Sequence, residues 1–231
     1  MITWFCEWRS SGSNRIDVPD ADVRGLGALI RDCRSVASAV ILRPITAVDP
    51  HYLDQSQASS LAVQINFADT RSLEAALSRS GRLAALFEPD LFPNLQDLHP
   101  SQEIMVQRRY PVLTRTDSVP DQEVAYLVTY EGPACDEVAW HTAYLSRHPV
   151  LLGKLVGLRE LEIFTPAIAA SELRIPLVRS LQRNKTVFAS AELMREAMLS
   201  DVRKELRADF DTLPPFEGVA RHEPHSVTRV I

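Results

Sequence analysis

The chain has 231 residues, of which 45% are hydrophobic and 24% charged, the balance of an ordinary globular protein with a sizeable core. The formal net charge of −5 at pH 7 argues against a protein whose main task is to hold nucleic-acid phosphates. No apolar run approaches the roughly 20 residues that span a bilayer, and the first residues lack the basic start of an export signal. We therefore expect a cytoplasmic protein without nucleic-acid or membrane partners.

The first half of the chain predicts strands and helices in the order β-α-β-β-α-β. Segments rich in β-branched and aromatic residues predict strands over residues 2–8, 37–45, 60–67 and 104–110. Apolar residues at helical spacing predict one helix through Val23, Leu26, Ile30 and Cys33, and a second through Leu73, Ala76, Leu77 and Leu83. Asp69 stands where the second helix would start.

The second half repeats this order. Strands are predicted over residues 124–130, 158–165, within 177–188, and over 216–222. One helix opens at residues 133–137, and another covers 192–206 with Met194, Met198, Val202 and Leu206 on one stripe. Residues 67–77 also match 188–198 at an offset of 121 (188 minus 67), with Phe, Ala and a capping residue in register. We predict two modules, 1–115 and 123–231, joined by a proline- and aspartate-bearing linker.

Two such modules explain why the halves are fused. A four-stranded antiparallel sheet with both helices on one face leaves its other face uncovered. Two sheets packed face to face would bury those faces against each other and enclose an apolar cavity. We expect the imidazoles of the second half to project into that cavity.

Histidines are concentrated in the second half, at His141, His148, His222 and His225. His141 and His148 share a predicted helix stripe with Val138, Leu145 and Leu152, on the face expected to pack on the sheet. They are either core histidines bonded to neighbouring groups or pocket histidines. Seven helical residues rise about 10.5 Å, whereas ligands lie about 2 Å from a metal, so we expect no shared metal ion. Glycine-rich nucleotide fingerprints are also missing, and we expect no cofactor.

Acid–base chemistry is the function that these residues favour. A position near a helix C-terminus would favour the protonated form of His148, and a histidine that titrates near neutrality suits proton transfer on a small carbonyl or phenolic compound.

Tyr144 either donates a phenolic hydrogen bond or packs in the core. Arg159 either holds an anionic group or forms a surface ion pair. Asn184 and Phe188 share one face of a strand, and His222 could line the mouth of a barrel. The charged residues 203–209 are interpreted as a solvated helix face. His225 could also line the barrel mouth, and a loop or surface role suits it equally well.

Several separated motifs resemble the EthD-like family, named for a protein encoded with an ethyl tert-butyl ether degradation system. The resemblance covers about residues 123–225. It rests on the stretches 140–149, 155–159, 184–190, 200–203, 207–210 and 214–218, and on His222. Val156 stands where the family has a proline, and the first half lacks the histidine pair, so it would be a diverged copy and a structural partner.

The resemblance implies an α+β fold, with two tandem ferredoxin-like βαββαβ modules forming an α+β barrel. Superfamily members include cofactor-free monooxygenases, cyclases, isomerases and dehydratases. We therefore predict a cofactor-independent lyase, isomerase or cyclase acting on a small aromatic or ring-derived compound in a catabolic or secondary-metabolic pathway. The predicted acid–base residues are His141, His148 and Tyr144, and the substrate-binding residues are Arg159, Asn184, Phe188 and His222. A non-catalytic small-molecule-binding accessory protein and a cofactor-free monooxygenase are the alternatives. Self-association into a homodimer is left open.

Overall fold

The computed structural model describes residues 1–12, 16–45, 59–113 and 122–231. In the first half the elements are β1 (Ile2–Ser10), α1 (Asp20–Arg31), β2 (Val36–Pro44), β3 (Leu61–Phe67), α2 (Thr70–Ala76), two 3-10 turns (Arg82–Phe87 and Pro93–Leu95) and β4 (Leu98–Tyr110). In the second half they are β5 (Val124–Glu131), α3 (Glu137–Leu152), β6 (Leu158–Pro166), β7 (Gln182–Phe188), α4 (Ala191–Leu199), α5 (Asp201–Phe210) and β8 (Val219–Arg229). Within these ranges, no helix is long and apolar enough to cross a bilayer.

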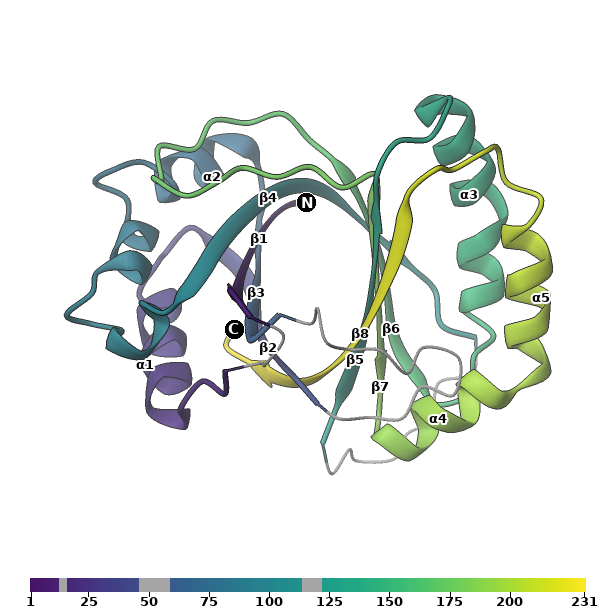
Figure 1. The fold of residues 1–231 in the computed structure, drawn as a ribbon, viewed down its shortest axis with the longest axis horizontal. Coiled ribbons are helices and arrows are strands. Elements are labelled where there is room, and N and C mark those ends of the chain that lie inside the picture. The colour runs from purple at the N-terminus through teal and green to yellow at the C-terminus, as the bar shows by residue number, and fades with distance from the viewer. Residues whose placement is uncertain (13–15, 46–58, 114–121) are drawn as a thin grey trace.

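Eight antiparallel strands close one barrel in the order β1-β3-β2-β8-β5-β7-β6-β4. Each half contributes four neighbouring strands, and the two halves join where β2 pairs with β8 and where β4 pairs with β6. The helices lie outside the barrel, with α1 and α2 beside the first half and α3, α4 and α5 beside the second (Figure 1). The predicted α+β barrel class is thereby confirmed.

The barrel interior differs from the predicted apolar chamber. Successive residues of a strand face opposite sides, so Trp4 and Trp8 pack under the helices while Phe5 and Glu7 point inward. The inward side of β7 carries Arg183 and Lys185, both buried. Arg183 bonds the carboxylates of Glu7 and Glu103, and Lys185 lies 2.8 Å from that of Glu162. The interior therefore contains a buried ion-pair network.

Two predicted boundaries of the second half were wrong. The single helix over 192–206 is two helices, because Ser200 has an extended backbone (φ −72°, ψ 162°) and ends α4 just before α5 begins. The last strand lies over Val219–Arg229 instead of 216–222. The stripe through Met194, Met198 and Leu206 is nevertheless buried, because all three side chains belong to the apolar core of the second half. The break at Ser200 turns α5 toward α3, which it contacts.

Helix α3 presents a different face to the sheet from the predicted one. Trp140, Tyr144 and His148 are buried at spacings of four, whereas Val138 is 77% exposed. Burying the rings of Trp140 and Tyr144 removes more apolar surface from water than burying the aliphatic stripe would. The helix therefore packs with these two rings toward the sheet. Pro149 lies within the last turn, and the helix continues to Leu152.

Candidate functional site

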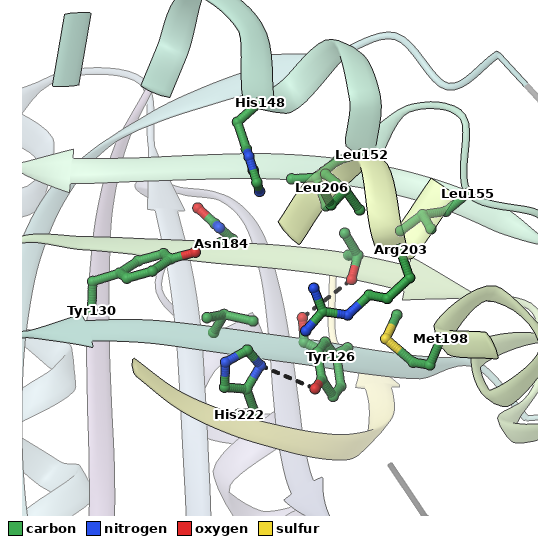
Figure 2. Close-up of a pocket in the computed structure, with 12 residues that line it drawn as sticks. Tyr126, Tyr130, His148, Leu152, Leu155, Asn184, Met198, Arg203, Leu206 and His222 are labelled. Atoms are coloured by element: carbon green, nitrogen blue, oxygen red, sulfur yellow. Dashed lines mark hydrogen bonds between the residues drawn. The ribbon is translucent and has the colours of Figure 1, made fainter. Parts of the chain in front are cut away.

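A pocket lies between the outer face of the second-half sheet and the helices that cover it, outside the barrel interior (Figure 2). Its volume is about 60 Å³, and an adjoining cavity of about 260 Å³ extends from it past Phe210 and Phe216. The residues that line the smaller pocket are Tyr126, Val128, Tyr130, His148, Leu152, Leu155, Asn184, Thr186, Met198, Arg203, Leu206 and His222. The residues that line both cavities are Tyr130, His148, Arg203, Leu206 and His222.

His148 reaches this pocket from α3 and is held by a carboxylate on α5. Its Nδ1 lies 2.9 Å from Oδ2 of Asp209, and both side chains are largely buried. An Nδ1–H that donates to a carboxylate leaves the lone pair of a neutral imidazole on Nε2. Within the described part of the chain nothing is hydrogen-bonded to Nε2 of His148, and the ring points from α3 into the pocket (Figure 2).

Electrostatics keep this imidazole neutral near pH 7. Burial lowers the pKa of His148 most, the positive charge of Arg203 adds to the decrease, and the bond to Asp209 opposes it without outweighing it. The helix C-terminus was predicted to favour the protonated form, and that prediction was wrong, because desolvation disfavours the charged ring more strongly. A neutral, oriented imidazole facing a pocket is able to act as a base.

A second histidine lies across the pocket from His148 (Figure 2). His222 on β8 has its Nδ1 3.0 Å from the hydroxyl oxygen of Tyr126 on β5, and their ring centroids are 5.7 Å apart. His222 was predicted to line the mouth of the barrel and to project into its interior, whereas it lies in this pocket on the outer face of the sheet. Tyr126 was missed, although the alternation of Tyr126, Val128 and Tyr130 along one strand places all three on the face toward the helices.

Tyr144 lies behind the pocket surface, next to Asn184, which is part of the lining. Tyr144 is fully buried, stacks on Trp140 with ring centroids 5.0 Å apart, and accepts a hydrogen bond from the amide of Asn184. Burial raises the pKa of the Tyr144 hydroxyl well above its ordinary value. Asn184 lines the pocket and also accepts a hydrogen bond of 2.9 Å from Gln182. The packing alternative therefore describes the contacts of Tyr144 best.

The structure places the other predicted residues outside the pocket lining. The ring of His141 bonds the carbonyl of Leu181 at 3.0 Å, and Arg159 pairs with Glu123 at 3.5 Å. Phe188 packs in the apolar core between sheet and helices. His225, for which a loop or surface role was one alternative, is fully buried on strand β8.

One residue of the pocket lining and the carboxylate that holds His148 come from the segment that was interpreted as a solvated helix face. Arg203 lines both cavities, and Asp209 holds His148. That interpretation was wrong for both, because α5 lies against α3 and turns part of its charged surface inward. The spacing of Arg203, Leu206 and Phe210 at three and four residues is the signal that could have found this face. Over the described ranges, no three His, Cys, Asp or Glu side chains gather closely enough to hold a metal ion.

Comparisons with known proteins bear on the fold. No family model matches the sequence, and neither does any curated protein. An anthrone oxidase-like protein of known structure is 12% identical, with a TM-score of 0.59 over 98% of this chain and 91% of its own. A candidate monooxygenase from Lactobacillus acidophilus is 11% identical, with a TM-score of 0.54 over 100% and 94%. One from Fusobacterium nucleatum is 8% identical, with a TM-score of 0.56 over 99% and 93%.

An EthD family protein from Bacillus halodurans is 21% identical and covers 43% of this chain and 95% of its own, with a TM-score of 0.35. For the three proteins matched along the whole length of this chain, identities of 8–12% show a likeness of fold alone. What this chain shares with the three proteins matched along its whole length is the α+β barrel closed by antiparallel strands.

Proposed function

We propose that the chain is an enzyme that removes a proton from a small ring-derived compound with His148, independently of a cofactor. The observation that carries the proposal is the His148–Asp209 pair, a buried neutral imidazole oriented by a carboxylate and facing a pocket. Tyr126, Tyr130 and Phe216 supply aromatic surface around the two cavities. Such surface suits a flat ring.

Lyase, isomerase and cyclase reactions on such compounds share a first step in which a proton leaves carbon or oxygen. The anion that remains would lie near Arg203, whose charge already acts on the pocket through its effect on His148. A fixed positive charge in a partly dry site stabilises a developing anion. The arrangement therefore supports proton abstraction as the common element of these reactions.

A cofactor-free monooxygenase is the second candidate, and the fold neighbours favour it. One is anthrone oxidase-like and two are candidate monooxygenases. If His148 removes the acidic C–H proton of anthrone, the carbanion can react with O2 to give anthraquinone and water, with one O2 consumed for each anthrone. Oxygen consumption with anthrone, lost in His148→Ala, would favour this candidate. Binding of anthrone without proton exchange or oxygen consumption would favour the accessory binding protein.

General-base activity can be tested with 5-nitrobenzisoxazole. A base removes the C3 proton, the N–O bond breaks, and a coloured cyanophenolate forms. We expect the protein to accelerate this reaction, His148→Ala to lower the rate about 100-fold, and Asp209→Asn to lower it about 10-fold because the ring loses its orientation. His99→Ala, a change at an exposed histidine outside the pocket, is the control and should leave the rate unchanged. Equal rates in the wild type and His148→Ala would contradict the proposal.

We also propose that residues 123–231 form an EthD-like module and that residues 1–115 are a diverged ferredoxin-like copy. Each half has the order β-α-β-β-α-β, with α4 and α5 in place of the last helix in the second half. The motif stretches that carry the family resemblance contribute His148, Asn184, Arg203 and Asp209, which lie in or beside one pocket. The catabolic or secondary-metabolic setting and the homodimer stay predictions, and light scattering in solution would measure the latter.

A further inference from the structure

We propose that Tyr126, hydrogen-bonded to His222, is a second catalytic residue that donates a proton to an oxygen atom of the substrate that His148 deprotonates. The inference rests on the proposed function of His148 and names the substrate class of the same site. That class comprises compounds with an acidic C–H on one side and a proton-accepting oxygen on the other.

The geometry places two proton carriers on two walls of one pocket. His148 enters from helix α3, whereas Tyr126 and His222 rise from the neighbouring strands β5 and β8 (Figure 2). In the β5–β8 ladder Val128 pairs with His222, so the side chain of His222 lies on the same face as that of Tyr126, two residues before Val128. Tyr126 is only 4% exposed, and its oxygen lies 3.0 Å from Nδ1 of His222.

The hydrogen bond gives the phenol a route for its proton. In the tautomer with hydrogen on Nδ1, His222 donates to the Tyr126 oxygen, and the phenol hydrogen is directed elsewhere. Both residues line the pocket, so a molecule bound there would lie beside the phenol hydroxyl. If Tyr126 gives up its proton, the Nδ1–H of His222 stabilises the resulting phenolate and can return a proton to it. His222 is thus a positioning residue for Tyr126.

The combined step balances without an oxidant or reductant. His148 Nε2 takes the proton from the substrate carbon, the C–H electrons form a new C=C bond, and the C=O electrons move onto oxygen. Tyr126 then gives its proton to that oxygen, so a ketone becomes its enol. His148 is left with one extra proton and Tyr126 with one fewer, and exchange with water restores both. The site would therefore isomerise an enolisable ring ketone, or dehydrate a substrate if the oxygen departs as water.

A series of benzisoxazoles separates the donor from the base. In 5-nitro-, 5-chloro- and unsubstituted benzisoxazole the base removes the same C3 proton, while the phenol product becomes progressively less acidic. A proton donor is needed most where the leaving oxygen is most basic. We expect Tyr126→Phe to slow the 5-nitro compound about 3-fold and the unsubstituted compound about 100-fold. The plot of log rate against leaving-group acidity should therefore be steeper than for the wild type.

The controls distinguish failure of this inference from failure of the proposed function. His148→Ala should slow all three compounds by the same factor, and His222→Ala should steepen the plot in part. Tyr110→Phe changes a tyrosine outside the pocket and should match the wild type. An unchanged slope in Tyr126→Phe overturns the donor role, whereas wild-type rates in His148→Ala overturn the proposed function, whatever the slope. Near-ultraviolet circular dichroism establishes that each variant is folded, and an unfolded Tyr126→Phe is replaced by Tyr126→Leu.

Discussion

Replacing Arg183 with methionine should destabilise the barrel strongly, because Arg183 is the cation at the centre of the interior. Its guanidinium bonds the carboxylate of Glu7, lies 2.6 Å from that of Glu103, and stands over the ring of Phe5. All three charged side chains are 2–3% exposed. Methionine fills similar volume without charge, so the variant keeps the packing and leaves two buried carboxylates without their shared partner.

Removing one partner of a buried ion pair costs about 3–5 kcal/mol of unfolding free energy. The low end applies here, since Glu7 keeps a contact of 2.6 Å with Arg9, and Glu103 keeps a hydrogen bond of 2.7 Å from the Ser180 hydroxyl. We expect a loss of about 3 kcal/mol, against a total of about 5–15 kcal/mol for a typical domain. For an m-value of about 3 kcal/mol per M, the urea midpoint should fall by about 1 M.

Urea unfolding at pH 7, followed by tryptophan fluorescence, measures this loss. Arg179→Met is the control, because Arg179 pairs with Glu137 at the surface and such pairs contribute at most about 1 kcal/mol. Burial raises the pKa of Glu7, but Arg183, Arg9 and Arg221 together hold it well below its ordinary value. The deficit of Arg183→Met should therefore shrink as the pH falls from 7 to 4 and the orphaned carboxylates take up protons. A loss below about 1 kcal/mol at pH 7 with an unchanged m-value would refute the reasoning.

Three further predictions concern stability. Because burial lowers the pKa of His148, the unfolded chain binds its proton first. Stability should thus decline as the pH falls below about 6.5, and His148→Gln should remove that part of the decline in urea titrations at pH 7.5 and 5.5. Gly157→Ala should cost about 1–3 kcal/mol, since Gly157 has φ +72° and its Cβ would lie 2.7 Å from Leu193. Gly27→Ala in α1 is the control, because the added Cβ would make only ordinary van der Waals contacts. If the thermal midpoint of Gly27→Ala is no higher than that of Gly157→Ala, the predicted strain at Gly157 is contradicted. Ser190→Ala removes the N-cap of α4, 3.3 Å from the Leu193 amide, and should cost about 1 kcal/mol; an unchanged midpoint would disprove the cap.

Local patterns in the sequence were sufficient for the order of the elements. A helix starts where a side chain accepts a hydrogen bond from a backbone amide of the first turn, so the start depends on residues close together in the sequence. Asp69, the predicted start of α2, accepts such a bond from the backbone amide of Ser72. Alternation and helical spacing likewise depend on near neighbours, so six of the eight strands lie close to or within their predicted ranges, whereas β4 starts at Leu98, six residues before its predicted start. The last strand was placed too early, and Ser200 was missed as the break between two helices.

The direction in which each face points was decided by the tertiary structure. All seven residues of β7 are buried, so its alternation reveals no solvent face, and Arg183 and Asn184 could not be assigned to the interior or to the pocket. Asp209 looked like surface charge because only the packing of α5 on α3 brings it to His148, 61 residues away in the chain. The sequence by itself determined the strands and most of the helices of the barrel, and it marked His148 as one of two candidate histidines on α3. The pocket and the carboxylate that holds its histidine depend on contacts between distant segments, which no local pattern encodes.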